Sequence, residues 1–231
     1  MSKASELKKL LTGHDYSRAG TAALRAAADA GMPEAMSELG AYLEDGVRGP
    51  GGRVLVRRDR LRAAQYEARL VKLGDRDATR GKADRLTRSP RTRVAGIRLY
   101  RRAYRLGSHT AAFHLAIAYR NLGDQRAAVR WFRRAVAAGD PSASMEVARA
   151  ELYGLGTRRD VPAAFAKLRA IAAAPTIMRP RNIDRIRALL LMADALEWGW
   201  LARIDYPASQ RLLRRAARLG STVAKQLLVD M

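Results

Sequence analysis

Cysteine is absent from this 231-residue chain, and aromatic residues make up only 6% of it. Without thiols there can be no disulfide and no thiolate metal site, and a reducing compartment is the natural expectation. No window approaches the roughly 18 uninterrupted apolar residues of a membrane span, and the N-terminus has no apolar stretch of secretory length. We therefore expect a cytoplasmic protein without a membrane span or signal peptide.

Acidic residues are scarce as well. The chain has 22 Asp and Glu against 44 Lys and Arg, so its net charge is +22. Residues 48–106 alone carry +14, whereas residues 1–47 carry −2 and residues 107–231 carry +10. Such a field attracts nucleic acid, acidic protein surfaces or anionic lipid. Only 7 of the 44 basic residues are Lys; the abundance of Arg and Ala is typical of a GC-rich bacterial genome, so compositional drift on solvated faces is an alternative explanation.

One short pattern recurs along the chain: a glycine, three residues and an alanine. Small or apolar residues precede each glycine at helical spacing, and others follow each alanine at the same spacing, which predicts two amphipathic helices per copy. In three copies an Asp stands where the first helix would begin, and Asp is a good N-cap, as Gly is a good C-cap. The copies are Gly31/Ala35, Gly74/Ala78, Gly107/Ala111, Gly139/Ala143 and Gly220/Ala224, and a further copy near Ala188 lacks its glycine.

We name the helix before each glycine the B helix and the helix after it the A helix. B helices are predicted near residues 16–30, 59–73, 92–106, 124–138, 160–174 and 205–219. A helices are predicted near residues 33–45, 76–87, 109–121, 141–154, 183–199 and 221–230. Because one pair cannot bury its own apolar stripe, the pairs must stack. This predicts an all-α solenoid of about six repeats, a single domain over residues 1–231, with loop insertions at 47–58 and 175–182.

The repeat resembles the Sel-one-like repeat (SLR) family, within the tetratricopeptide-like superfamily. The resemblance is carried by Ala143-x3-Val147-Ala148-x5-Gly154-Leu155-Gly156-x3-Asp160-x3-Ala164, by Asp124-x3-Ala128-x2-Trp131-Phe132-x2-Ala135-x3-Gly139 and by Ala35-x3-Leu39-Gly40-x5-Gly46-Val47. It implies a right-handed α/α superhelix whose A helices line the concave side, and an adaptor function. A secreted branch of the family carries one disulfide per repeat; this cysteine-free chain departs from it, so any activity suggested for that branch is not carried over.

Residue patterns typical of catalysis or metal binding are not found. The three histidines, His14, His109 and His114, form no His-x3-His pair. The glycines at 49, 51 and 52 follow no predicted strand and lack the Gly-Lys-Ser/Thr ending of a phosphate loop. We therefore expect no catalytic residue, no cofactor and no metal, and a protein that is not an enzyme.

The A-helix positions that face away from the core stripe are the first candidate binding site, a concave groove. These positions carry both charges together with aromatic and apolar residues, a mixture that favours a protein ligand. Trp198 and Trp200 flank Gly199, and only one of the two is easily buried, so an exposed anchor is expected there. The groove set is Glu38, Tyr42, Asp45, His114, Ile117, Asn121, Glu146, Arg149, Tyr153, Leu191, Asp194 and Trp198.

Arginines at equivalent B-helix positions, and in the 47–58 loop, are the second candidate site. The basic face comprises Arg101, Arg102, Arg105, Arg133, Arg134, Arg214, Arg215 and Arg218, and the rim comprises Arg48, Arg53, Arg57, Arg58 and Trp200. Our main hypothesis is a scaffold that binds a partner protein with an acidic surface, possible contexts being a secretion, effector or toxin-inhibitor system. The alternative is nucleic-acid binding by the arginine ladders and the 47–58 loop, with affinity that falls steeply with salt.

Overall fold

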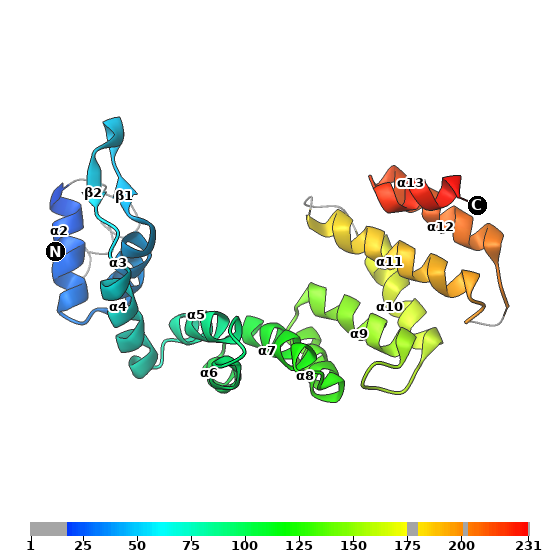
Figure 1. Ribbon diagram of the computed structural model, residues 1–231, viewed down its shortest axis with the longest axis horizontal. Helices are drawn as coiled ribbons and strands as arrows, with labels where there is room; N and C mark the ends of the chain where they lie inside the picture. Colours follow the sequence, from blue (N-terminus) through cyan, green and yellow to red (C-terminus); the bar gives the residue numbers. More distant parts are fainter. Residues whose placement is uncertain (1–17, 175–179, 201–202, 231) are drawn as a thin grey trace. The chain divides into compact units, whose positions relative to one another are not determined.

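The computed structural model describes residues 18–174, 180–200 and 203–230, and these form an almost purely helical chain (Figure 1). The B helices are α2 (Arg18–Asp29), α4 (Arg60–Leu73), α6 (Arg93–Arg105), α8 (Gln125–Ala137), α10 (Val161–Ala173) and α12 (Tyr206–Arg218). The A helices are α3 (Pro33–Asp45), α5 (Arg76–Thr87), α7 (Thr110–Asn121), α9 (Pro141–Tyr153), α11 (Pro180–Glu197) and α13 (Thr222–Val229). The predicted all-α helical-repeat solenoid is thus confirmed, with most helix ends within two residues of the predicted positions.

Capping residues fix these helix ends. The Asp59, Asp124 and Asp205 carboxylates accept the backbone N–H three residues ahead, as N-caps do, at the starts of α4, α8 and α12. The repeat glycines follow B helices in the left-handed region, where only glycine is unstrained, with φ +84° at Gly74 and +85° at Gly139. Short local signals therefore set both ends of these B helices.

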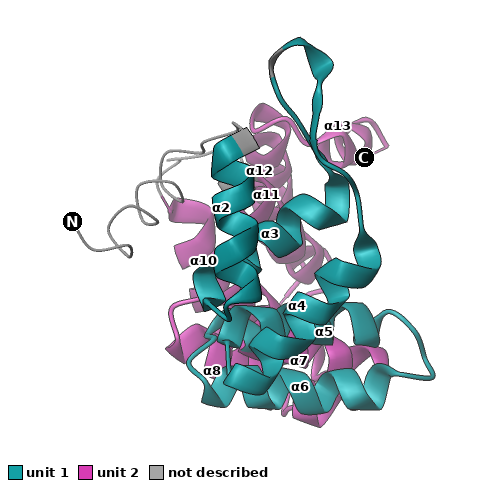
Figure 2. Ribbon diagram, turned by 90° about the vertical axis from the view of Figure 1, so that its left-hand side faces the viewer, with its two compact units in different colours: residues 1–111 teal, residues 112–231 magenta. Residues whose placement is uncertain are grey.

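The chain divides into two compact units, residues 1–111 and 112–231 (Figure 2). The described part of unit 1 contains α2 to α6, and its core gathers Met36 and Leu39 of α3 with Tyr66 and Leu70 of α4. Gly96 lets α6 approach α5, since a Cβ there would lie 3.0 Å from the Ala83 carbonyl oxygen. A side chain larger than glycine would therefore force the two helices apart.

The segment 47–58 is not the plain loop that we predicted. Val47–Arg48 (β1) and Val54–Val56 (β2) pair antiparallel around a 3-10 turn at Pro50–Gly52 (η1). The turn glycine Gly51 has a φ of +70°, which permits the tight reversal. Val56 is only 2% exposed in the core of unit 1, so burial of an apolar side chain anchors the hairpin.

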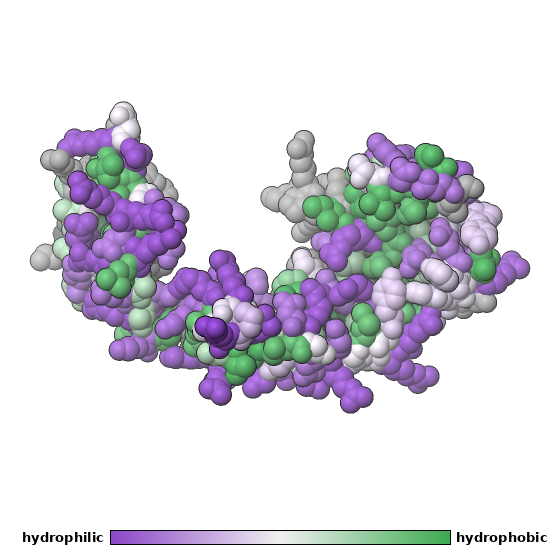
Figure 3. Space-filling model, viewed as in Figure 1, coloured by the Kyte–Doolittle hydropathy of each residue, from purple (hydrophilic) through white to green (hydrophobic). Residues whose placement is uncertain are grey.

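The core of unit 2 joins α9, α10, α11, α12 and α13. Its largest fully buried side chains include Met145, Leu152, Leu168, Leu189 and Leu213, packed among many alanines. Figure 3 shows hydrophilic side chains over most of the visible face of unit 1, and hydrophobic side chains gathered over α11 in unit 2.

Our loop prediction for 175–182 is wrong at its end, because α11 begins at Pro180. Proline is tolerated in the first turn of a helix, where its missing N–H would have no intrahelical partner. The remainder of that predicted loop, residues 175–179, lies outside the described residues.

Candidate functional site: the A-helix face

Three predicted groove residues meet between α9 and α11 in unit 2. The Asp194 carboxylate accepts one hydrogen bond from the Tyr153 hydroxyl and one from the Trp198 indole N–H, each at 3.1 Å. Burial, followed by the charge of Asp194, raises the pKa of Tyr153 to about 12, so this phenol remains a donor throughout the neutral range. The hydrogen bond to Asp194 orients the Trp198 side chain, although this residue is 68% exposed.

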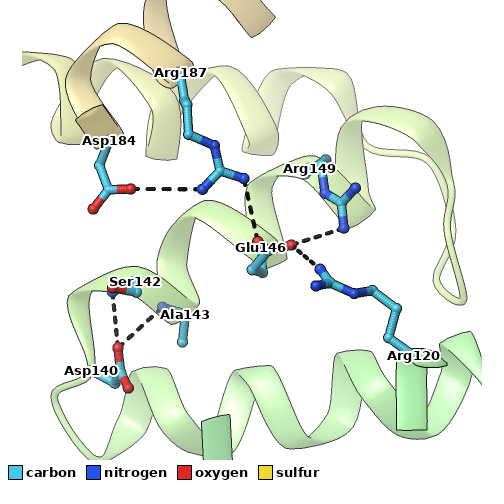
Figure 4. Close-up of polar contacts among 8 residues, drawn as sticks. All are labelled: Arg120, Asp140, Ser142, Ala143, Glu146, Arg149, Asp184 and Arg187. Atoms are coloured by element: carbon cyan, nitrogen blue, oxygen red, sulfur yellow. Dashed lines mark hydrogen bonds and ion pairs between the residues drawn. The ribbon is translucent and has the colours of Figure 1, made fainter. Parts of the chain in front are cut away.

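A second cluster surrounds Glu146 on α9, whose carboxylate is only 8% exposed (Figure 4). Arg120 of α7 donates to it at 2.7 Å, and Arg149 of α9 donates at 2.9 Å. Arg187 of α11 reaches the other carboxylate oxygen at 3.4 Å and lies 3.8 Å from Asp184. Three guanidinium groups face two carboxylates, so the cluster has one positive charge in excess.

Glu146 therefore acts inside the protein. A carboxylate this buried and this fully bonded is not free to receive a ligand, although Arg149 and Arg187, 33% and 46% exposed, still reach the solvent. Arg120 and Arg187 were not among the predicted groove residues. Their partners lie 26 and 41 positions away in the sequence, so no local periodicity could have identified them.

The other predicted groove residues of unit 2 are placed differently. His114 is half-buried, with its ring 6.0 Å from that of Phe113, and Ile117 is also half-buried. Leu191 packs against the core of unit 2, whereas Asn121 is exposed at the end of α7.

In unit 1 the groove residues come from α3. The Tyr42 hydroxyl donates to Glu38 at 2.7 Å, so these two residues share a face as predicted. Asp45, at the end of the same helix, lines a 520 Å³ pocket together with Arg48, Arg57 and Arg58 of the hairpin. The structure thus brings a predicted groove residue together with three of the predicted rim arginines. The fourth, Arg53, is exposed at the hairpin turn.

The predicted basic-face arginines lie on α6, α8 and α12, and all are exposed except the half-buried Arg102. Several have partners within the chain. Arg134 stacks on Trp131 at 4.3 Å, Arg214 bonds Gln210 at 3.3 Å, and Arg215 donates to the Ala172 carbonyl at 3.0 Å. Some of the basic-face arginines therefore stabilise the helices of unit 2 through contacts within the chain.

Charge is divided unequally between the two kinds of helix. Within the described bounds, the six B helices hold 21 basic and 2 acidic residues, and the six A helices hold 10 basic and 11 acidic residues. Compositional drift toward arginine would enrich both kinds of helix and would not remove acidic residues from one of them. The division is therefore a property of the repeat and not of the genome alone.

Two further classes of site are absent from the described residues. Over 18–174, 180–200 and 203–230, no three His, Asp or Glu side chains cluster as metal ligands would. In the same ranges, no helix combines the length and the apolar character needed to cross a bilayer.

The repeat of this chain matches that of a known family. The Sel1 repeat family model, which describes the SLR family named above, matches residues 33–74, 90–108, 110–140, 141–166 and 186–221, well over half of the chain. No curated protein shows significant sequence similarity to this chain.

Two solved structures share the fold. One is c5321 of uropathogenic Escherichia coli, a protective antigen with an SLR fold, at 22% identity and a TM-score of 0.64; the alignment covers 89% of this chain and 42% of that one. The other is a Sel1 repeat protein from Oxalobacter formigenes, at 16% identity and a TM-score of 0.64, covering 94% and 88%. This chain thus spans less than half the length of the E. coli protein.

Proposed function

Because the chain belongs to the Sel1 repeat family, whose members generally act as protein-interaction scaffolds, we propose that it binds a partner protein through its A-helix face and acts without catalysis. The observation that carries the proposal is the exposed Trp198, fixed by Asp194 beside Tyr153. An aromatic side chain that is already ordered in the free protein loses little entropy on binding, and aromatic residues contribute much of the energy of many interfaces.

The chemistry of this face supports a protein as the ligand. Its helices are nearly balanced in charge, which suits a mixed polar and apolar partner surface better than a uniform polyanion. The excess positive charge around Glu146, on arginines that reach solvent, adds a preference for acidic groups. We therefore propose a partner with an acidic surface, in a bacterial cytoplasm; secretion, effector and toxin-inhibitor systems are the contexts to examine.

Site-specific photo-crosslinking in the native host tests this proposal. A photoreactive residue at position 198 should yield a defined crosslinked protein, whereas the same residue at position 206, an exposed tyrosine on B helix α12, should not. Replacing Trp198 with Ala should then weaken binding of the identified partner about tenfold or more, and Tyr206→Ala should have little effect. Equal crosslinking from both positions, or none from 198, would contradict the proposal.

The division of charge favours a second candidate function, nucleic-acid binding by the B helices. With 21 basic residues against 2 acidic, the B helices of each unit could contact a phosphate backbone, and the exposed Arg57 and Arg58, just before α4, add positive charge to unit 1. The expected mark is affinity for generic DNA or RNA that falls linearly in a log–log plot against salt.

A matched pair of variants tests this candidate within one unit. Arg218 of α12 and Lys225 of α13 are both exposed, and among the described residues neither has a side-chain partner. Arg218→Glu should weaken binding and reduce the salt slope by about 1, while Lys225→Glu should change it less. Generic oligonucleotides that fail to bind at physiological salt, or equal effects of the two variants, would rule against it.

A further inference from the structure

A pocket of 690 Å³ lies in unit 2, where the loop between α9 and α10 meets α8 and the chain after α11. It is lined by Arg133 of α8, by Arg158 and Arg159 of the loop, and by Trp200. None of the residues that line it belongs to the Glu146 cluster. We name it the Arg158 pocket.

The two carboxylates of the Arg158 pocket already have partners. Glu151, with its side chain 10% exposed, accepts from Lys167 Nζ at 2.7 Å and lies 3.5 Å from Arg133. Asp160 caps α10 by accepting the Ala163 N–H at 3.0 Å. Among the described residues, neither carboxylate forms an ion pair with the loop arginines Arg158 and Arg159.

The positive charges of Arg158 and Arg159 remain available to a negatively charged ligand. Arg159 uses its Nε to donate to the Leu152 carbonyl at 3.2 Å, and its guanidinium lies 4.6 Å from the Trp200 ring centroid. A neutral carbonyl and an indole face orient the guanidinium without cancelling its charge. Arg158 is exposed, and within the described part of the chain it has neither a side-chain hydrogen bond nor an ion pair.

The loop that carries them is held firmly. The Leu155 N–H donates to the Ala150 carbonyl at 2.9 Å, and the Asp160 N–H donates to the Glu151 backbone carbonyl at 2.8 Å. Gly156 has a φ of +69° and packs so tightly that a Cβ there would overlap the Gln125 backbone at the start of α8. The arginines thus project from a preorganised segment, which lowers the entropy cost of binding.

The kind of anion that the Arg158 pocket can bind depends on which of its donor groups and aromatic surfaces have no partner within the chain. Phosphate is usually cradled by free backbone N–H groups at a helix N-terminus, but here Asp160 occupies that position and Pro162 has no N–H. Trp200 already contacts Arg159 and, at 5.2 Å between centroids, Tyr153, so it offers little surface for a nucleobase. The guanidinium groups remain as donors. They can pair with carboxylates or phosphates, and because the backbone N–H cradle that phosphate usually uses is missing, we favour carboxylates.

We propose that the Arg158 pocket binds an acidic peptide segment of the partner, with Arg158 and Arg159 receiving its carboxylates. This inference rests on the proposed scaffold function and gives it a recognition rule: the partner presents an extended run of Asp and Glu. The pocket volume accommodates a few residues of such a run.

The test uses the full chain and two labelled peptides, one rich in glutamate and one with glutamine at every glutamate position, followed by fluorescence anisotropy at physiological salt. The glutamate peptide should bind, and the glutamine peptide should bind at least about tenfold more weakly. Arg158→Glu should weaken glutamate-peptide binding about tenfold or more, and Arg158→Gln should weaken it less.

The matched control is Arg169→Glu on α10, which makes the same change in net charge at an exposed arginine outside the pocket. It should alter the affinity less than about twofold if the pocket is the site. Equal losses for Arg158→Glu and Arg169→Glu, tight binding of the glutamine peptide, no binding of either, or displacement of the peptide by inorganic phosphate or an oligonucleotide would each overturn the inference.

The outcome is separable from that of the proposed function. A partner that crosslinks at position 198 yet is indifferent to Arg158→Glu would overturn the pocket inference alone. Pocket-dependent binding of the peptide, with no partner captured at 198, would overturn the proposed use of the A-helix face and leave the pocket standing.

Discussion

At the scale of single residues, Glu146 is the clearest case of a side chain whose role is set by its surroundings. A buried carboxylate is costly unless it is paired, and here three arginines from α7, α9 and α11 share it. The arrangement links successive A helices through one charge. It also keeps Arg149 and Arg187 extended at the solvent edge of this face.

Replacing Glu146 with Gln should lower the free energy of unfolding by roughly 1–3 kcal/mol, because the partly exposed guanidiniums would lose a charged acceptor. Urea or thermal denaturation followed by circular dichroism measures the change. Glu38→Gln, which removes the charge from a half-buried carboxylate held by Tyr42, is the comparison and should cost less. Equal losses of stability in the two variants would show that the three arginines around Glu146 add no more stability than the single Tyr42 contact of Glu38.

Gly156 offers a sharper contrast within unit 2. Gly156→Ala adds a Cβ that overlaps the Gln125 backbone, whereas Gly123→Ala, at a φ of +81°, adds one to open space. Gly123→Ala should cost only the left-handed penalty of about 1–2 kcal/mol, and Gly156→Ala should cost clearly more. Melting temperatures of the two variants decide the matter, and a Gly156 variant as stable as the Gly123 variant would contradict the described packing.

Sequence reasoning located part of the candidate site at this scale. Tyr153, Asp194 and Trp198 were predicted because they occupy equivalent repeat positions on A helices, and the structure brings them into contact. Arg158 and Arg159 were not predicted, because their value depends on a loop conformation and on a tryptophan some 40 residues onward. Contacts between side chains so far apart in the sequence do not follow the helical periodicity from which the other residues were predicted.

At the scale of elements, helix boundaries were predictable because each repeat carries its own start and stop signals. The Asp caps and left-handed glycines act within one turn of the helix, so tertiary structure need not be known. The hairpin was missed because its strands are only two and three residues long, and what anchors them is Val56 in the core. The start of α11 was misjudged because Pro180 was taken to exclude a helix that it in fact begins.

Two tyrosines that join neighbouring elements should make the fold sensitive to alkali. Burial first, and then a nearby Asp, raises the pKa to about 12 for both Tyr100, which contacts Asp84, and Tyr153. In the unfolded chain these phenols ionise near their ordinary pKa of 10, so the unfolded state binds fewer protons above that pH. Stability should therefore be fully present below pH 10 and fall as pH rises toward 12.

Ultraviolet titration of the folded protein checks this directly, because phenolate absorbs at longer wavelength than phenol. Tyr153→Phe and Tyr100→Phe should each remove one late-titrating group and flatten the loss of stability in the alkaline range. Ionisation of both groups close to pH 10 in the folded protein would contradict the described contacts with Asp194 and Asp84.

At the scale of the whole molecule, a net charge of +22 on 231 residues should oppose the compact state by self-repulsion. Adding salt screens exposed like charges over about 10 Å at roughly 0.1 M, so Tm should rise by a few degrees between low and physiological ionic strength. Thermal melts in chloride and in a second monovalent anion at equal ionic strength separate screening from specific anion binding. A Tm that falls with salt would mean that ion pairs such as those of Glu146 outweigh the repulsion.

The Glu146 contacts also bear on how such an array can evolve. Repeat proteins diversify when whole modules are duplicated, lost or exchanged, and this is easiest where a module depends only on its immediate neighbour. Here a single carboxylate ties arginines on three consecutive A helices, and Arg187 and Glu146 stand 41 positions apart. Excising the module that contains α9 would leave Arg120 and Arg187 without the carboxylate that they share, so we expect the stretch from Arg120 to Arg187 to be inherited as one block.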